Sequence, residues 1–333
     1  MGSESCPTFT ALRVVAAPLS GISDAPFRTV AARWGADLVV SEMVASRAVL
    51  ESSRQARRER AKLPRESGIA VQLAGCDPAL MAEAARVAEG EGAASIDINF
   101  GCPAKKVVNQ AAGSALMADE ALAGAILAAV VRAVSVPVSV KMRLGWRQDR
   151  RNAARIAEIA EACGIGLLAV HGRTRDQGFK GQADWSAVAA VRAVTGLPLL
   201  VNGDIATPRD AVSAKRAAGS QGVMIGRGAC GRPWLLREAK AALCGRPLPA
   251  APDLATRADS ACQHYQAILL HYGREQGLRI ARKHLGWYLD ALPGGEAWRA
   301  CLLRSDDPDQ VLRDLELAHE TAGEAAPACV AAA

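Results

Sequence analysis

The 333-residue sequence has no Cys-x-x-Cys pair, although it contains nine cysteines. An odd number of cysteines cannot pair completely within one chain. Their scatter from Cys6 to Cys329 also shows no spacing typical of metal ligands. These absences argue against a disulfide scaffold and against a bound metal, and we expect a reducing, cytoplasmic setting.

Long apolar runs and a recognisable targeting segment are missing as well. The most apolar stretch, Ala121 to Val131, is followed by Arg132 and is well short of a membrane span. The N-terminus shows no basic segment followed by an apolar one, which is the pattern of a signal peptide. We therefore expect a soluble cytosolic protein with no membrane partner.

The composition suits a large apolar core, because 50% of the residues are hydrophobic. A chain of this length fits one large domain with a small appendage. The formal net charge of +6 favours a polyanionic partner such as RNA, although total charge alone does not establish one.

Short β-branched, apolar runs alternate with Ala-rich helical segments along the first three quarters of the chain. This alternation predicts a parallel sheet, and eight strands is the number that closes a TIM barrel. The predicted fold class is therefore α/β, a (β/α)8 barrel. The expected strands are Arg13–Ala17, Leu38–Ser41, Ile69–Leu73, Ser95–Asn99, Val138–Met142, Leu167–His171, Leu199–Asn202 and Gly222–Ile225.

Polar and glycine-containing clusters stand at the carboxyl ends of these strands. In a (β/α)8 barrel all such ends meet at one mouth, where the active site lies, whereas a doubly wound sheet would bring only a few together. We therefore predict one site at the mouth. The clusters are 17–21 (Ala-Pro-Leu-Ser-Gly), 41–43 (Ser-Glu-Met), Gln72, 99–103 (Asn-Phe-Gly-Cys-Pro), 141–143 (Lys-Met-Arg), 171–174 (His-Gly-Arg-Thr), 202–204 (Asn-Gly-Asp) and 226–227 (Gly-Arg).

The chain changes character after Ala242. A Pro-rich segment at 247–252 is typical of a stiff linker, so we assign residues 1–246 to the barrel domain. From 253 to 320 the pattern is helical throughout and predicts a small all-helical C-terminal domain. Residues 321–333 are expected to form a disordered tail.

Several strand ends carry groups suited to an anionic ligand. The segments 202–204 and 226–227 suit a phosphate, because loops after the last two strands of this barrel often bind one; the alternative is that Gly226 only ends a strand and Arg227 is solvated. Lys141 closes an apolar strand, where its ammonium needs a partner unless it reaches solvent at the rim. His171 is either a ligand contact or a satisfied core histidine.

Cys102 stands on a tight turn over the predicted mouth, between a glycine that permits the turn and a proline that stiffens it. A cysteine thiol is mostly protonated near neutrality and can therefore serve as an acid. A buried structural cysteine is the usual alternative. The position on a mouth loop favours the acid.

Together these residues resemble the tRNA-dihydrouridine synthase family, and the stretch 97–107 (Asp-Ile-Asn-Phe-Gly-Cys-Pro-Ala-Lys-Lys-Val) resembles its bacterial DusB branch. The likeness covers nearly the whole chain, in order. Leu19-Ser20 and Phe100 depart from the usual Met-Ala and Met, and we expect altered packing rather than lost activity. The further matching segments are 16–28, 40–43, 171–175, 202–205, 224–227, 231–234, 279–284 and 287–289.

The resemblance implies FMN as the cofactor. It places Cys102 at the family's proton-donor position, and Asn99 matches an asparagine that holds the target uracil. Arg143 and Arg173 are further candidate substrate contacts. The residues expected to hold FMN are Pro18, Leu19, Ser20, Gln72, Lys141, His171, Asn202, Gly203, Asp204, Gly226 and Arg227.

The implied reaction is reduction of the C5=C6 bond of a D-loop uridine in tRNA, with a hydride from reduced FMN to C6 and a proton from Cys102 to C5. NADPH, or NADH, supplies the electrons and docks transiently, because no fingerprint of a separate Rossmann domain is found. Which uridine is reduced, and which nicotinamide is preferred, the sequence does not say.

The helical tail is the expected grip on tRNA. Arg279, Arg282 and Lys283 recur at helical spacing and can meet phosphates, although such a stripe is more often a solvated helix face. Basic clusters at 54–60 and 147–151 follow the second and fifth expected strands and would extend the RNA track. We expect the protein to act as a monomer.

Two other functions stay open on the sequence. One is an FMN-dependent barrel oxidoreductase acting on a free small molecule, which would not need the basic helical tail. The other is a non-catalytic RNA-binding or regulatory protein, which would not need an acid such as Cys102 beside a flavin.

Overall fold

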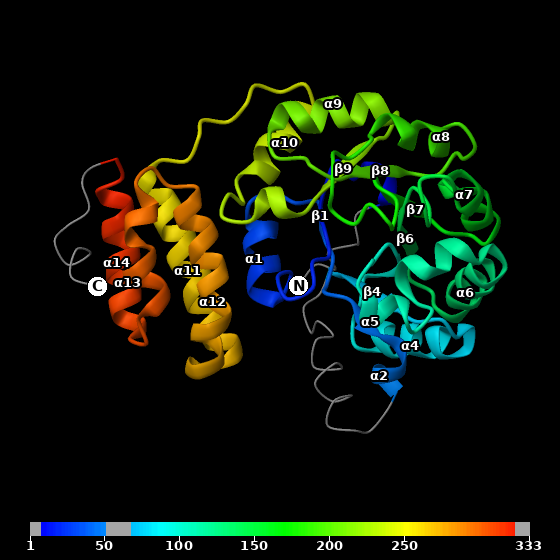
Figure 1. The fold of residues 1–333 in the computed structure, drawn as a ribbon, viewed down its shortest axis with the longest axis horizontal. Helices are drawn as coiled ribbons and strands as arrows, with labels where there is room; N and C mark the ends of the chain where they lie inside the picture. Colours follow the sequence, from blue (N-terminus) through cyan, green and yellow to red (C-terminus); the bar gives the residue numbers. More distant parts are fainter. Residues whose placement is uncertain (1–7, 51–67, 324–333) are drawn as a thin grey trace.

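The computed structural model describes residues 8–50 and 68–323 (Figure 1). Two expectations therefore lie outside the described residues, the basic cluster at 54–60 and most of the tail at 321–333. Within the described ranges, no helix is both long enough and apolar enough to cross a membrane.

All strands of the described chain belong to one parallel sheet that curls into a barrel, which confirms the predicted fold class. The order of the strands is β2-β1-β9-β8-β7-β6-β5-β4-β3. Every strand from β4 to β9 agrees with its expected position to within one residue at each end. The strands are β1 (Val14–Ala16), β2 (Leu38–Val39), β3 (Val44–Ala45), β4 (Ala70–Ala74), β5 (Ser95–Phe100), β6 (Val138–Arg143), β7 (Leu167–His171), β8 (Leu199–Asn202) and β9 (Gly222–Ile225).

The second barrel strand is split into β2 and β3, where the sequence predicts one strand at Leu38–Ser41. β2 pairs with β1, β3 pairs with β4, and Val40 bridges Ala70 between them, so this one stretch closes the ring. At the interruption the Ser41 hydroxyl donates to the carbonyl of Glu42 and accepts from the amide of Gln72, at 2.9 and 3.0 Å. The side chain thus satisfies backbone groups that a continuous ladder would have paired.

Helices cover the outside of the barrel, and several begin at an acidic cap followed by proline. Asp24 and Asp77 accept hydrogen bonds from the first turns of α1 and α4, and Thr207 and Asp210 form a capping box on α9. These helices are α1 (Ala25–Arg33), α2 (Ser46–Leu50), α4 (Pro78–Gly90), α5 (Lys105–Val108), α6 (Glu120–Ala133), α7 (Ala153–Ala162), α8 (Ala189–Arg192), α9 (Pro208–Ala218) and α10 (Leu235–Leu243).

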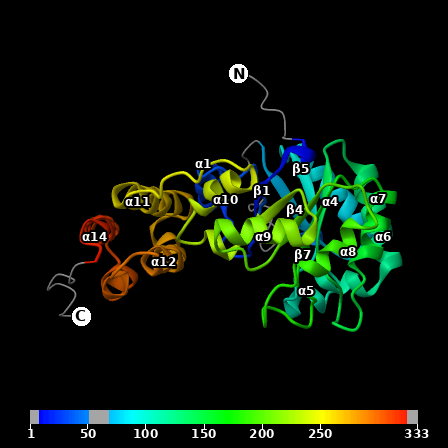
Figure 2. The same cartoon turned by 90° about the horizontal axis from the view of Figure 1, so that it is seen from above.

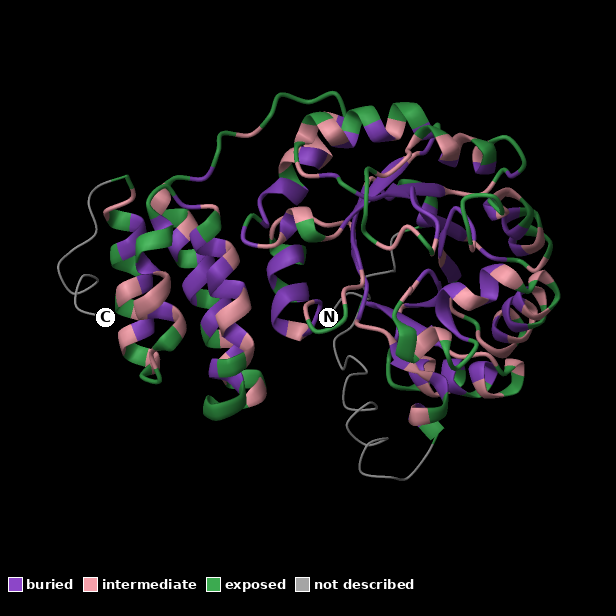
Figure 3. Ribbon diagram, in the orientation of Figure 1, coloured by how far each residue is buried: buried purple, intermediate pink, exposed green. Residues whose placement is uncertain are grey.

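Side chains alternate along each strand between the inside of the barrel and the helical layer. In β7, Leu167 and Ala169 belong to the cluster inside the barrel, while Leu168 and Val170 pack under the helices. By the same period of two, His171 faces inward. Figure 3 shows the strands buried throughout and the exposed residues gathered on the outer faces of the helices.

The C-terminal region is a helical bundle with its own apolar core, which includes Tyr265, Tyr288 and Trp298. The residues between α10 and α11 form neither helix nor strand. Figures 1 and 2 both place the bundle to one side of the barrel, next to α1. Its helices are α11 (Leu254–Tyr272), α12 (Arg274–Asp290), α13 (Arg299–Arg304) and α14 (Pro308–Glu320).

Phe27 of α1 is central to the contact between barrel and bundle. It is 4% exposed, and its ring lies 6.1 and 6.2 Å from the rings of His264 and His284. Beside it, the indole nitrogen of Trp34 donates to the hydroxyl of Ser260 at 2.9 Å. Arg33 of α1 also donates to the side chain of Gln263, so the contact is mainly apolar with hydrogen bonds at its edge.

We expect Phe27→Ala to lower the free energy of unfolding by about 3–5 kcal/mol, because the truncation leaves a cavity between the barrel and the bundle. Urea denaturation followed by circular dichroism measures it. Phe179→Ala is the matched control; this ring is 61% exposed, and the change should stay below about 1 kcal/mol. Equal losses in the two variants would contradict a buried contact at Phe27.

Candidate active site

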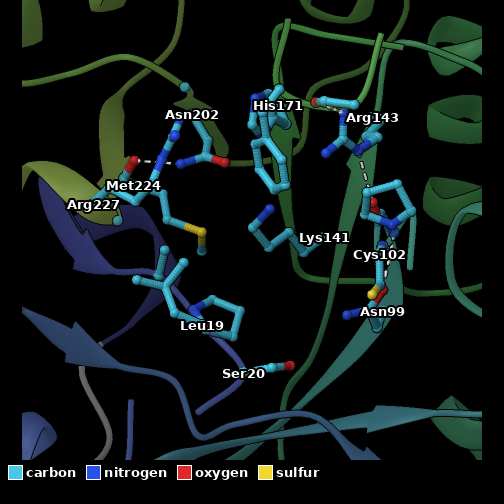
Figure 4. Close-up of a pocket in the computed structure, with 18 of the residues that line it drawn as sticks. Leu19, Ser20, Asn99, Cys102, Lys141, Arg143, His171, Asn202, Met224 and Arg227 are labelled. Carbon is cyan, nitrogen blue, oxygen red and sulfur yellow. Dashed lines mark hydrogen bonds between the residues drawn. The ribbon is translucent and has the colours of Figure 1, made fainter. Parts of the chain in front are cut away.

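A cavity of about 1040 Å³ opens at the carboxyl ends of the strands (Figure 4). All eleven residues that the sequence assigns to the cofactor line it, and so do Asn99, Cys102 and Arg143. Arg173 and the three expected tRNA contacts of the tail are not among its lining residues. The alternation along the strands accounts for the agreement, because the polar residues near each strand end occupy inward positions.

A chain of buried hydrogen bonds crosses the barrel beneath the cavity. The Asp97 carboxylate accepts from the hydroxyl of Ser139 and from the amide nitrogen of Gln72, each at 2.6 Å. The Gln72 carbonyl in turn accepts from the amide nitrogen of Asn99 at 2.7 Å. Burial raises the pKa of Asp97, and both donors oppose that rise. The four side chains are buried and bond to one another, and two of them, Gln72 and Asn99, also line the cavity.

Asn99 connects this chain of hydrogen bonds to the loop that carries Cys102. Its side-chain oxygen accepts from the backbone amides of Gly101 and Cys102, at 3.0 and 2.9 Å. The carbonyl of Cys102 accepts from the amide and hydroxyl of Ser114, at 3.1 and 2.8 Å. The turn is thus held on both sides, and the half-buried thiol has a defined place on the cavity wall.

Lys141 has a charged group with no partner in the described structure. No hydrogen bond or ion pair joins its ammonium to another described residue, and Figure 4 shows it pointing into the space between His171, Met224 and Leu19. Burial and the nearby guanidinium of Arg143 lower the pKa of Lys141 to about 8. A cation in this setting is stabilised by an anionic or accepting ligand.

His171 is neutral at physiological pH. Burial first, then Lys141 and the surrounding arginines, lowers its pKa to about 2. Its Nε2 lies 3.2 Å from a guanidinium nitrogen of Arg173, which can only donate. Nε2 must therefore accept, so the proton is on Nδ1 and this nitrogen is a donor.

Arg143 and Arg173 are engaged by the protein itself. Arg143 donates to the carbonyls of Gly101, Thr174 and Gly178, at 2.7 to 2.9 Å. Arg173 donates to the carbonyls at 180 and 181 and forms a two-point ion pair with Asp204, at 2.5 and 3.0 Å. Arg143 still lines the cavity, whereas Arg173 supports its wall from behind.

Asp204 has a strained backbone, with φ of +54°. Burial works to raise its pKa, but hydrogen bonds from Arg173 and the amide of Ala183 bring the pKa below the usual value. Arg227 adds a looser ion pair at 3.7 Å and remains 60% exposed at the cavity edge. The pairing neutralises the carboxylate, so Asp204 does not repel an anionic ligand beside it.

Sequence reasoning missed Phe179, which lines the cavity and lies between the guanidinium groups of Arg143 and Arg227, at 5.6 and 5.0 Å. An exposed aromatic residue after a strand carries no pattern that would have singled it out. Sequence reasoning also missed the G-x-G-x-x-G spacing of Gly226, Gly228 and Gly231. In the structure this spacing reflects close packing: a Cβ at Gly228 would lie 2.2 Å from the carbonyl oxygen of Ile205.

The basic residues of the tail are not gathered at the cavity. Arg279 is exposed and has no partner among the described residues, while Arg282 forms an ion pair with Asp306 at 3.1 Å. Lys283 donates to the carbonyl of Gly21, next to the cavity wall. The cluster at 147–151 is partly paired within the barrel, through Arg151 and Asp184 at 3.1 Å.

We expect Asn99→Asp to destabilise the protein by roughly 1–3 kcal/mol, because a carboxylate oxygen would then face the carbonyl of Gln72. Urea denaturation at pH 7 measures the change. Asn109→Asp is the control, since Asn109 is exposed, and it should shift stability by less than about 0.5 kcal/mol. If both variants are equally stable, the hydrogen-bond chain does not hold the loop.

Comparison with known proteins agrees with the geometry. Residues 14–326 match the model of the family described as Dihydrouridine synthase (Dus). A probable tRNA-dihydrouridine synthase of Rhodobacter capsulatus is 50% identical over 90% of this chain and 92% of its own. The tRNA-dihydrouridine synthase B of Pseudomonas aeruginosa is 48% identical over 89% of this chain and 90% of its own.

Among solved structures, a 6-hydroxypseudooxynicotine amine oxidase from Pseudomonas geniculata N1 has a TM-score of 0.51 at 16% identity, over 69% of this chain and 47% of that one. Histamine dehydrogenase from Rhizobium sp. 4-9 has a TM-score of 0.50 at 12% identity, over 76% and 48%. At such identity these two show the fold alone. The family model and the curated relatives, which match nearly the full length, show that the chain belongs to the dihydrouridine synthase family.

Proposed function

We propose that this protein is a tRNA-dihydrouridine synthase that reduces the C5=C6 bond of a D-loop uridine in tRNA, with FMN as cofactor and NADPH as the electron source. The observation that carries the proposal is one cavity that holds both the ammonium of Lys141, which has no partner among the described residues, and the thiol of Cys102 on a fixed loop. The names of the relatives support the same substrate.

The cavity fits FMN in its chemistry and its size. Lys141 offers a cation for an electron-rich ring, and the first amides of the short 3-10 turn η4 (Arg227–Ala229) have no acceptor inside that turn, which suits a phosphate. The volume is at the upper end of ordinary ligand pockets, which leaves room for a base beside the cofactor. The other residues that would hold FMN are Pro18, Leu19, Ser20, Gln72, His171, Asn202, Gly203, Asp204 and Gly226.

When bound in its reduced form, FMN supplies the hydride that C6 of the uracil receives. The C5=C6 bond is conjugated with the C4 carbonyl, so negative charge collects on that oxygen until C5 is protonated. Cys102 holds the proton for C5, on a turn that Asn99 and Ser114 keep in place. The ammonium of Lys141 stabilises negative charge within the cavity.

Charge around the mouth supports a nucleic-acid substrate. Lys105, Arg227 and Arg232 line the rim of the cavity and are exposed, and Arg175 beside them is partly exposed. A uridine in folded tRNA must leave its stack to enter, and contacts with the phosphates offset that cost of a few kcal/mol. The exposed Arg279 of the tail is a further candidate phosphate contact.

Cys102→Ala should lower the rate of dihydrouridine formation by roughly 10²–10⁴-fold, the usual contribution of a positioned acid. The assay is mass spectrometry of tRNA that lacks the modification, after incubation with enzyme and NADPH. Cys163→Ala is the control, because this cysteine donates to Gly124 in the helical layer, outside the cavity. Native protein that binds FMN and oxidises NADPH but leaves tRNA unchanged would overturn the proposal.

The affinity for FMN should fall as the pH rises above about 8. Lys141 has a depressed pKa of about 8 in the free protein, and an anionic ligand raises it, so binding is strongest while the ammonium is charged. The test is to measure the dissociation constant for FMN on apoprotein at several pH values between about 6 and about 10, which span the pKa of Lys141. Lys141→Met should bind more weakly and lose the alkaline decline; a decline that persists in this variant would assign it to another group.

A further inference from the structure

The helical bundle touches the loop that forms one wall of the cavity. This loop, residues 18–24, follows β1, and Pro18, Leu19, Ser20 and Ile22 line the cavity. Lys283, on the α12 face turned toward the barrel, donates to the carbonyl of Gly21. Tyr272, the last residue of α11, donates to the carboxylate of Asp24 at 3.0 Å. Two residues of the bundle therefore hold the loop near its middle and at its end.

The two contacts fall on Gly21, which has a positive φ, and on Asp24, a buried carboxylate that caps α1. Gly21 has φ of +74°, and its amide donates to the Glu42 carboxylate, so the barrel holds one side of this residue and the bundle the other. Asp24 is 4% exposed and caps α1 with its second oxygen, through the amide of Phe27 at 3.0 Å. Burial raises the pKa of Asp24, and Tyr272 and Lys283 counteract the rise.

The bundle also packs against the loop that follows β9. Gly231, with φ of +70°, lies so close to α12 that a Cβ there would be 2.1 Å from the carbonyl oxygen of Trp287. This glycine follows Gly226 and Arg227, which line the cavity. The same helix thus contacts the loops after β1 and after β9.

We propose that Lys283 and Tyr272 are positioning residues of the cofactor pocket, which they stabilise from the helical bundle by fixing the loop 18–24. This inference rests on the proposed use of FMN. It reassigns Lys283, which the sequence placed on tRNA phosphates. In the structure the Lys283 ammonium donates to the carbonyl of Gly21, whereas Arg279, one turn earlier on α12, is exposed and has no partner among the described residues. Docking of the bundle and binding of FMN are then coupled, and each favours the other.

The test compares Lys283→Met with Arg279→Met in the full-length protein. We expect the dissociation constant for FMN, measured by flavin fluorescence on apoprotein, to rise about five- to tenfold in Lys283→Met, the loss of one partly exposed charged hydrogen bond. In Arg279→Met it should stay within about twofold of native, while the KM for tRNA rises. Lys283→Arg, which keeps a donor, should recover most of the FMN affinity.

Tyr272→Phe provides a second, milder change at the same loop. We expect weaker FMN binding here as well, and a double variant whose loss is smaller than the product of the two single losses, because both residues hold one segment. The melting temperature of each apoprotein shows that the variants remain folded.

Unchanged FMN affinity in Lys283→Met, together with a raised KM for tRNA, would make Lys283 a phosphate contact and overturn the inference. If native protein bound no FMN at all, the result would overturn the proposed function itself rather than the positioning role of Lys283. FMN bound by native protein, with equal affinities in native and Lys283→Met, would therefore contradict the positioning role alone.

Discussion

The alternation of side chains along the parallel strands is the constraint on which the site depends. Every second residue of a barrel strand must face inward, and the inner space is closed at one end by apolar residues such as Leu12 and Leu167. Nearer the carboxyl ends the inward positions are Gln72, Asn99 and Lys141, so the same period that builds the core also delivers polar groups to the cavity. The polar residues of the cavity therefore occupy ordinary inward positions of the barrel, the last one or two before the carboxyl end of a strand.

Placing polar groups inside a barrel creates a cost that the surrounding structure must offset. Hydrogen bonds among Asp97, Gln72 and Asn99 offset the desolvation cost of these side chains. Arg143 and Arg173 offset theirs by donating to backbone carbonyls and, for Arg173, to Asp204. These interactions leave the Lys141 ammonium as the charge in the cavity floor without a described partner. A well-satisfied shell around one unsatisfied cation is an arrangement suited to ligand binding, because little of the shell must rearrange when the ligand enters.

The helical bundle does more than extend the molecule. Its contact with α1 is apolar around Phe27, and two of its polar contacts, from Tyr272 and Lys283, fall on the loop 18–24 beside the cavity. In the proposed function, the bundle contacts tRNA and also supports the wall of the FMN pocket, so its contact with the loop 18–24 would couple recognition of tRNA to cofactor binding. This makes the orientation of the bundle part of the chemistry of the site.

The sequence by itself determined most of the barrel strands, the mouth, the loop of Cys102 and the polar residues at the strand ends that line the cavity, because period and turn chemistry are local properties that a chain displays in order. It missed the split of the second strand, where the partner groups of Ser41 come from the folded sheet, and it missed Phe179. The sequence also did not show which lysine and arginine side chains form hydrogen bonds within the protein and which remain available to a ligand. Lys283 finds its partner 262 residues away, and Arg143 finds partners 31 and 35 residues away. Such pairings depend on how distant segments meet in space, so only the tertiary structure decided them.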